Sequence, residues 1–459
     1  MNFKLKILSI ITLFTIVFAP FILSYGGISG DFPAYLKIAS EIPSPSNNLF
    51  PIGFPLILNV FSLLTKEYFY SSILLKIVCF ISIIGFAIWK RFYVTEIIIL
   101  LTLKSIVWTF IHQGSEYISY PFLFIYIYLI HQLFDHKIST KKFILFSSVI
   151  AFILVSLRYA NVFIFIATFL FYIICYKRTK KYTLPIILHL GLSAILISVY
   201  LLFNYIFFGS FTNENNRINN EYDNFLIDTY YDFIGVINLF NPLFYIKPLP
   251  FISTTQIIIS ILLIAFDLAL IYYISKWIIK IYKQHKIPLF ECFLIISALI
   301  ISILTFITAI FQGIEPLAQR LLANSFFLLW FGILILVRKQ HIISTQNLVY
   351  FAFASLILQT IYIVRIPTNF IHYKNEIETV LKKRQSIPIA YYDDLNETKV
   401  SVYQIPIVNK QIEKVHEQFQ PKNIHKAILR INYPSIIILD EKPKSFNGVI
   451  LSSELKITK

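Results

Sequence analysis

Long apolar runs dominate this sequence and recur from its first residues to about residue 364. A helix rises about 1.5 Å per residue and the hydrocarbon core of a bilayer is about 30 Å thick, so roughly 20 apolar residues make one crossing. Hydrophobic residues make up 57% of the chain and charged residues only 14%, and the mean hydropathy is +0.72. This composition is too apolar for a soluble protein, so we expect lipid to surround most of the chain.

The apolar runs predict an all-α polytopic membrane protein with about eleven transmembrane helices. The expected crossings lie near residues 6–25, 69–89, 92–111, 117–134, 143–157, 161–176, 184–208, 255–275, 289–311, 320–337 and 346–364. The first run follows Lys4 and Lys6, as in a secretory signal. The small-residue pattern of a cleavage site does not follow it, so we interpret this run as a permanent helix.

Basic residues are concentrated in alternate loops, and cytoplasmic loops are the ones that accumulate lysine and arginine. The richer side includes Lys90, Arg91, Lys141, Lys142, Lys180, Lys181, Lys280 and Lys283. Apart from the C-terminal tail, the poorer side holds Lys37, Lys66, Arg158, Arg217, Lys247 and Arg320. The sequence therefore predicts a multi-pass protein of the bacterial inner membrane, with the N-terminus in the cytoplasm and, after an odd number of crossings, an external or periplasmic C-terminus.

The formal net charge of +16 follows from this loop asymmetry and requires no nucleic-acid partner; anionic lipid headgroups complement it. The three cysteines fall in or beside apolar spans and form neither a disulfide framework nor a metal-binding spacing. Motifs that hold metals or cradle phosphates are likewise not found, so the sequence indicates no cofactor. A divalent metal would have to be bound by scattered carboxylates.

The composition changes after residue 364, where mixed charges and shorter apolar runs begin. The stretches KVSVYQIPIV, PSIIILDE and GVILSSELKI are typical of strands, and NKQIEKVHEQFQ is typical of a helix. About 90 residues suffice for a small domain. We therefore expect two domains, a membrane module over residues 1–364 and a small external α/β domain over residues 365–459.

The glycines and prolines gather on the expected external side, most densely between residues 26 and 55. Irregular backbone is tolerated in a membrane protein mainly outside the hydrocarbon or around a cavity. Within this first external loop, the alternation from Asp31 to Ala39 predicts a surface helix with Asp31 at its start. Residues 50–64 then predict an apolar helix too short to cross, which we expect to lie along the interface.

Several motifs in this order resemble the GT-C superfamily of polytopic glycosyltransferases, which use polyprenyl-phosphate sugars, and especially its mannosyltransferase-like and aminoarabinose-transferase-like members. They are Asp31 with Tyr35 and the following FPIGFP, GSEYISYPFLFIYIYL (114–129), LRYANVFIF (157–165), FNYIFFGSFT (203–212), INLFNPLFYIKP (237–248) and EPLAQRLLANSFFLLWFG (315–332). Their shared order and shared side carry the resemblance, which covers roughly residues 1–340.

The resemblance implies that a hexosyl or pentosyl group moves from a polyprenyl-phosphate donor to an acceptor hydroxyl, with inversion, on the external face of the cell envelope. Asp31 is the candidate general base, because a hydroxyl nucleophile must lose its proton as the new bond forms. Candidate substrate-binding residues are Tyr35, Lys76, Glu116, Arg158, Glu315 and Arg320. The two arginines suit a departing phosphate, and Lys76 is a charge placed inside a crossing. The sequence does not identify the acceptor.

Other readings of these residues stay open. Asp31 and Glu116 could serve as helix caps, and Arg158 and Arg320 could extend to the interface without binding a ligand. Lys104, deep in the expected third crossing, has a possible partner in Asp267 at similar depth. The chain as a whole could instead be an O-antigen or exopolysaccharide polymerase, or a lipid-linked sugar transporter or flippase, for which ionisable residues in mid-membrane and paired broken helices would be typical.

Overall fold

The fold was analysed in a computed structural model of the whole chain. The structure describes residues 3–22, 32–45, 48–65, 68–112, 114–213, 225–244, 254–284, 287–312, 317, 319–364, 390–392, 437–439 and 449–451. Contacts within the chain divide it into two compact units. The first unit comprises residues 1–12, 79–110 and 115–359, and the second comprises residues 13–78, 111–114 and 360–459.

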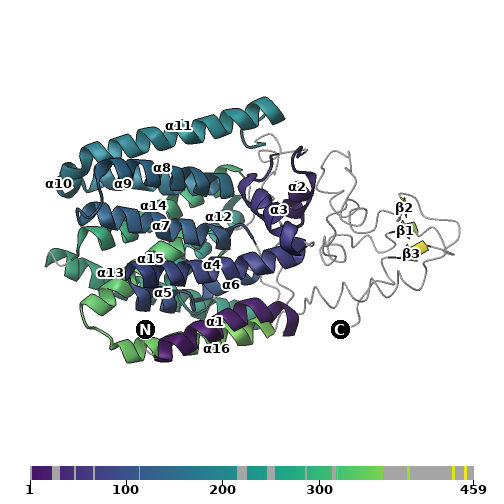
Figure 1. Cartoon of the computed structure of the whole chain (residues 1–459). Coiled ribbons are helices and arrows are strands. Elements are labelled where there is room, and N and C mark those ends of the chain that lie inside the picture. Colours follow the sequence, from purple (N-terminus) through teal and green to yellow (C-terminus); the bar gives the residue numbers. More distant parts are fainter. Residues whose placement is uncertain are drawn as a thin grey trace. The chain divides into compact units, whose positions relative to one another are not determined.

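Helices account for most of the described chain (Figure 1). Their bounds are α1 Phe3–Ile22, α2 Phe32–Glu41, α3 Gly53–Thr65, α4 Tyr68–Lys90, α5 Val94–Leu100, α6 Lys104–His112, α7 Glu116–Phe134, α8 Thr140–Leu157, α9 Val162–Ile174, α10 Tyr176–Thr179, α11 Thr183–Phe208, α12 Phe225–Ile237, α13 Thr254–Lys283, α14 Leu289–Gln312, α15 Ala323–Lys339 and α16 Thr345–Val364. Short 3-10 turns are η1 Tyr159–Asn161, η2 Lys180–Tyr182 and η4 Asn238–Phe240.

The described helices have the length and apolarity of a membrane protein. Seven of them could cross a bilayer by these criteria, or eight if the bent pair α5 and α6 forms one span. The remaining expected crossings coincide with helices α1, α9 and α15. Since α9 has 13 residues and α15 has 17, both are shorter than a typical span. The all-α class is thus confirmed, whereas the count of eleven crossings stays a prediction.

The expected crossing at 92–111 is wrong as a single helix, because the chain bends by 64° between α5 and α6. The backbone groups freed at this break find partners elsewhere in the first unit. The carbonyl of Thr102 accepts a hydrogen bond from Ser355 Oγ at 2.9 Å, and the amide of Lys104 donates to the carbonyl of Pro242 at 3.1 Å. A broken helix is tolerated in a membrane when neighbouring elements satisfy its backbone in this way.

Helix α15 is the central helix of the first unit. All its side chains from Ala323 to Leu336 are buried, as expected for a helix that is apolar on every face. It packs most extensively against α14 and also contacts α5 and α7. Gly332 permits the close approach of α14, because a Cβ atom there would lie 3.1 Å from Ile295 and 3.2 Å from Leu294.

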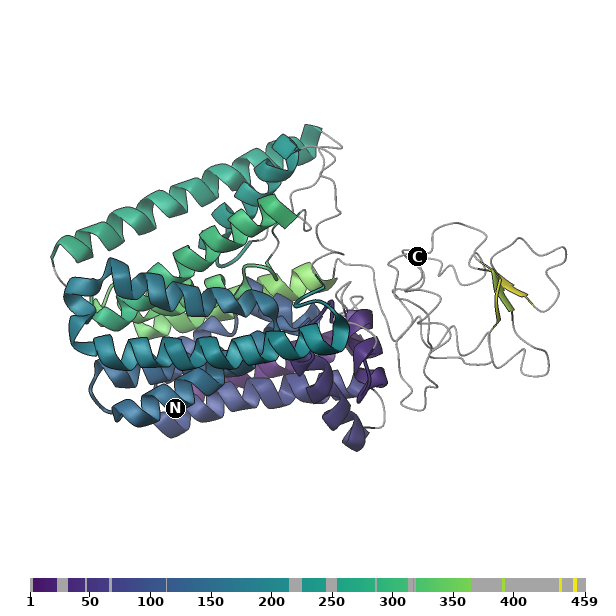
Figure 2. The same ribbon diagram turned by 90° about the horizontal axis from the view of Figure 1, so that it is seen from above.

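Helices α7, α8, α9 and α11 are joined by a buried polar cluster that the sequence analysis did not identify. The ring of His189 is fully buried on α11. Its Nε2 atom lies 3.0 Å from the Tyr126 hydroxyl, which also lies 3.0 Å from Thr168 Oγ1. Its Nδ1 atom lies 2.9 Å from Ser147 Oγ and 3.1 Å from Ser148 Oγ. Such hydrogen bonds hold helices together where lipid gives no hydrophobic driving force between them. Helices α8 and α11 accordingly lie side by side (Figures 1 and 2).

The second unit contains α2 and α3, the two short helices of the first loop, and they pack against each other. The expected short helix at 50–64 corresponds to α3, and the expected helix after Asp31 corresponds to α2, whose described side chains are buried; its place on the surface stays a prediction. The described tail residues form a parallel three-stranded sheet in the order β2-β1-β3, from Ile437–Ile438, Ala390–Tyr392 and Val449–Leu451. The α/β domain over 365–459 and the boundary at 364 stay predictions.

Candidate functional site

A buried ion pair joins the start of α7 to the end of α8. Glu116 is the first residue of α7, and Arg158 directly follows α8 with an extended backbone. Nη2 of Arg158 lies 3.3 Å from Oε1 of Glu116, and the two side chains are only 11% and 5% exposed. Each charge compensates the other, since a buried charge without a partner carries a large desolvation cost.

The same arginine also holds the segment before α15. Nη1 of Arg158 donates a hydrogen bond of 3.0 Å to the backbone carbonyl of Arg320. A guanidinium has five N–H donors in a rigid plane, so it can bind the carboxylate and the carbonyl together. Arg320 itself lies in a turn and is partly exposed. Arg158 therefore fixes the position from which the Arg320 side chain extends.

Two asparagines add further hydrogen bonds next to the Glu116–Arg158 pair. Asn161, in turn η1, donates to Ser119 Oγ at 3.1 Å and to the carbonyl of Leu154 at 2.7 Å. Asn324, in the first turn of α15, donates to Asn161 Oδ1 at 2.6 Å. Both asparagines are buried. The ends of α7, α8 and α15 are thus joined by a continuous set of polar contacts.

Helix α12 holds the same segment from another direction. Asp232 Oδ1 accepts a hydrogen bond of 2.8 Å from the backbone amide of Leu317. One turn along the helix, Gly235 allows the two backbones to approach, because a Cβ atom there would collide with the carbonyl oxygen of Leu317. Leu317 is therefore positioned by α12, and Arg320 by Arg158.

Lys104 occupies a second buried cluster next to this segment. Its ammonium group donates to the carbonyl and the side-chain oxygen of Asn238 and, at 2.6 Å, to the carbonyl of Phe244. Asp267 accepts a hydrogen bond of 2.7 Å from Asn241. Among the described residues no ion pair joins Lys104 to Asp267, so the suggested pairing stays a prediction. Three oxygens use the three donors of Lys104, so its role is to hold the chain around η4.

The two clusters meet at a small cavity. It measures about 10 Å³, and its lining includes Lys104, Gly235, Asn238 and Gln319. Gln319 is buried, and its Oε1 atom has no hydrogen-bond partner in the described part of the chain. A cavity of this volume is about large enough for one water molecule. The residue before Arg320 thus faces the Lys104 cluster, while the Arg320 carbonyl faces Arg158.

Among the residues predicted from the sequence, the structure brings together Glu116, Arg158 and the backbone of Arg320. Tyr35 belongs to the second unit, where its buried ring packs against the rings of Phe50 and Phe54. Lys76, also in that unit, is fully buried in α4, and its Nζ has no hydrogen-bond partner among the residues that the structure describes. The candidate base Asp31 and the candidate ligand Glu315 lie outside the described residues.

The structure also bears on the alternative readings. Glu116 stands at the helix start where a cap would lie, but its carboxylate contacts Arg158. The Arg158 side chain is only 11% exposed and is bound at two nitrogens, so it does not extend freely to the interface. In the described ranges, His, Cys, Asp and Glu side chains form no group of three or more that could hold a metal ion.

Sequence reasoning missed Asn161, Asp232 and Asn324. Each is a polar residue within or beside an apolar stretch, and buried polar groups in membranes require partners. That signal marks them as buried and bonded, but it does not identify the partners on other helices, which are 42 to 163 positions away.

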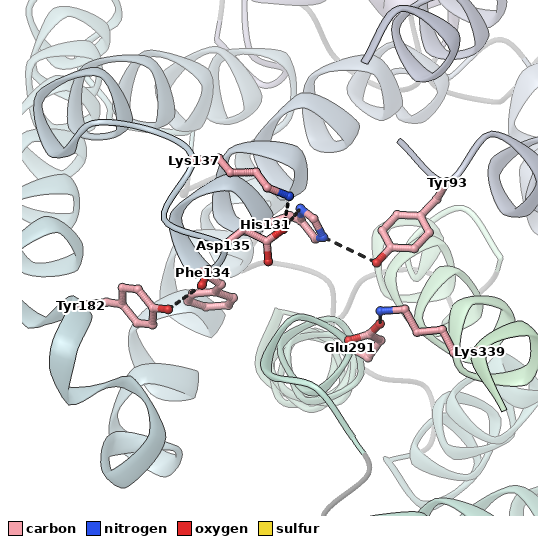
Figure 3. A network of polar contacts seen from close by, with 8 residues as sticks. All are labelled: Tyr93, His131, Phe134, Asp135, Lys137, Tyr182, Glu291 and Lys339. Carbon is pink, nitrogen blue, oxygen red and sulfur yellow. Dashed lines mark hydrogen bonds and ion pairs between the residues drawn. The ribbon is translucent and has the colours of Figure 1, made fainter. Parts of the chain in front are cut away.

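A second polar network lies at the other ends of α7 and α15 (Figure 3). Lys339 binds Glu291 at the start of α14, and the Tyr93 hydroxyl lies 3.5 Å from His131 Nε2. Asp135 accepts a hydrogen bond of 2.7 Å from Lys137. Partial burial of Asp135 opposes its ionisation, but this hydrogen bond and the surrounding positive charges lower its pKa below the usual value. The acidic groups of this network are therefore neutralised by cations within it.

Comparisons of the chain with protein-family models, with curated proteins and with solved structures find no match.

Proposed function

We propose that the chain is an integral membrane glycosyltransferase that moves a sugar from a polyprenyl-phosphate donor to an acceptor hydroxyl, with inversion. The observation that carries this proposal is the convergence of Glu116, Arg158 and Arg320. These residues belong to three separate motifs of the resemblance and lie 42 to 204 positions apart in sequence. Residues from three motifs far apart in the sequence are expected to meet if these motifs build one site.

The contacts suggest different roles for the two arginines in this reaction. The charge of Arg158 is already balanced by Glu116, which weakens its attraction for a further anion. Arg320 is partly exposed and is held in place through its backbone. We therefore assign the departing phosphate to Arg320 and the positioning of Arg320 to the Glu116–Arg158 pair. Fixed cations at this point would stabilise the charge that develops on the leaving group.

Asp31 is the proposed general base, as the resemblance implies, and Tyr35, Lys76 and Glu315 are proposed to contribute to substrate binding. The proposal includes eleven crossings in the bacterial inner membrane, a cytoplasmic N-terminus and an external C-terminal domain. Basic residues in the last turns of α4, α13 and α15 support this orientation. A reporter fused after Lys459 tests it, because activity of a cytoplasmic reporter at that position would reverse the assigned side.

The decisive experiment is transfer by the purified protein in liposomes that contain radiolabelled polyprenyl-phosphate sugars. Asp31→Asn should abolish transfer, and Arg320→Gln should reduce it at least tenfold while the protein still folds. Lys280→Gln, an exposed cation at the end of α13, is the matched control and should transfer at the wild-type rate. Equal transfer by wild type and Asp31→Asn would remove Asp31 from the mechanism, and no transfer by wild type with any donor would contradict the proposed function.

One observation favours a second candidate, a lipid-linked sugar transporter or flippase. The break between α5 and α6 lies directly before buried Lys104, and broken helices with buried ionisable groups are typical of transporters. The same liposomes distinguish the two functions. A flippase would move the labelled donor across the bilayer without forming a glycosidic bond, and Lys104→Met would stop that movement.

A further inference from the structure

A groove lined by isoleucine opens between α9, α13 and α14 in the first unit. Its volume is about 580 Å³, which falls in the range of ligand-binding cavities. The apolar lining consists of Ile173, Ile174, Ile278, Ile279, Ile287, Ile295 and Ile296. Several of these side chains are exposed, including Ile174 and Ile279. In a membrane, such a groove would accept a hydrocarbon chain.

A cluster of cations stands at the mouth of this groove. Lys177, Arg178, Lys180 and Lys181 follow one another along α10 and η2, and all four side chains are exposed. Lys177 and Arg178 line the groove itself. The stretch from Tyr176 to Thr183 contains no acidic residue. Clusters of this kind beside a transmembrane helix are suited to acidic lipid headgroups.

Arg178 links the cation cluster to the groove. Its Nη2 atom donates a hydrogen bond of 2.8 Å to the carbonyl of Ile287, just before α14. The guanidinium is thereby held across the groove mouth with other N–H donors still available. Arg178 also lines an adjoining cavity of about 290 Å³, together with Lys181 and Tyr182. The two cavities are thus connected through a positioned cation.

The acidic residues near this mouth do not cancel its charge. Glu291 is bound by Lys339 and Asp135 by Lys137. In the described part of the chain, neither Arg178 nor any lysine of the cluster forms an ion pair. Lys181 Nζ lies over the Tyr182 ring and 3.1 Å from His136 Nε2. The positive charge of α10 and η2 is therefore available to a ligand.

From this geometry we infer that the groove and its basic mouth form a binding site for an anionic phospholipid. An acyl chain lies along the isoleucines, and the headgroup phosphate is bound by Lys177, Arg178 and Lys181. A free phosphate ion would gain nothing from the apolar groove, and a zwitterionic lipid carries an amine that opposes the cations. The site is separate from the Glu116–Arg158 cluster and does not depend on the proposed glycosyl transfer.

The first test measures lipid retention by native mass spectrometry of the full chain purified from membranes of phosphatidylglycerol and phosphatidylcholine. The wild type should retain phosphatidylglycerol. Lys177→Gln with Lys181→Gln should reduce retention at least fivefold, whereas Lys141→Gln with Lys142→Gln should not. The control pair is equally exposed and equally charged, at the start of α8. Equal retention by both double variants and wild type, or equal loss in both, would overturn the inference.

The second test reports on the groove in the unaltered protein. Cys175 lines the groove and is partly exposed, whereas Cys79 is buried in α4 and lies outside it. Phosphatidylglycerol should slow maleimide labelling of Cys175 at least threefold, while phosphatidylcholine and inorganic phosphate should not; peptide mapping identifies the labelled cysteine. Ile279→Trp, a change at an exposed lining position, should narrow the groove and reduce retention with the cations intact. Labelling that is insensitive to lipid, or equally sensitive to phosphatidylcholine, would contradict an anionic-lipid site.

Discussion

Arg158 binds Glu116 at 3.3 Å and the Arg320 carbonyl at 3.0 Å through different nitrogens of one guanidinium. The carboxylate neutralises the arginine, and the arginine in turn fixes the turn that carries Arg320. The Arg158 side chain therefore connects the start of α7 and the end of α8 to the turn that precedes the central helix α15. This coupling gives the candidate site its geometry and leads to the first prediction.

Glu116→Gln should destabilise the protein by about 3 kcal/mol, because the change leaves the Arg158 charge buried without its partner. Fluorescence-detected thermal unfolding in detergent measures the effect. The double variant Glu116→Gln with Arg158→Gln should be more stable than Glu116→Gln alone, since it removes the orphaned charge. The single variant Arg158→Gln completes the comparison. If the stability lost in the double variant equals the sum of the losses in the two single variants, the two residues are not energetically coupled.

Gly235→Ala should lower the thermal midpoint and the yield of folded protein. A methyl group there meets the carbonyl oxygen of Leu317, which is backbone and cannot rotate away. The matched control is Gly191→Ala in α11, where a Cβ atom would meet nothing within 4 Å. This control should be neutral or stabilising by up to about 1 kcal/mol, because alanine is favoured over glycine inside a helix. Equal effects of the two variants would refute the close approach of α12 to Leu317.

Tyr126→Phe should cost about 1 to 3 kcal/mol, because it leaves the buried groups of His189 and Thr168 without a shared hydroxyl. Tyr273→Phe is the control, since that side chain is 66% exposed on α13, and it should leave the thermal midpoint unchanged. Chemical denaturation in mixed micelles compares the pair. If Tyr126→Phe is as stable as the control, the polar cluster does not hold the four helices together.

Lys104→Met should loosen the chain between η4 and Phe244, because three oxygens then lose their common donor. Hydrogen exchange of peptides covering residues 238–244 should rise at least tenfold. Lys280→Met, at an exposed position of α13, should not change exchange in those peptides. Unchanged exchange in Lys104→Met would mean that the lysine does not hold this segment.

Much of the fold could be predicted from the sequence, because lipid imposes a simple rule on the chain. A crossing needs about 20 apolar residues whose backbone groups bond within one helix, so the helices α4, α7, α11 and α14 begin and end close to the predicted positions. The basic residues expected at the ends of these apolar runs lie in the last turns of α4, α13 and α15. The rule failed at residues 92–111, because the apolar run continues through a break in the helix. Ser355 and Pro242, from distant elements, form hydrogen bonds with the backbone groups at this break.

The candidate site could be predicted only in part. Charged residues in apolar surroundings are visible in a sequence, and this signal selected Lys76 and Lys104, whereas Glu116 and Arg158 came from the motifs of the resemblance. Their partners are not visible in it, because a hydrogen bond between positions 158 and 320 depends on how the helices pack. The sequence by itself thus determined a helical membrane chain and a short set of buried charges, since those follow from local polarity. Only the tertiary structure decided which charges meet, since contact over long sequence separation is a property of packing.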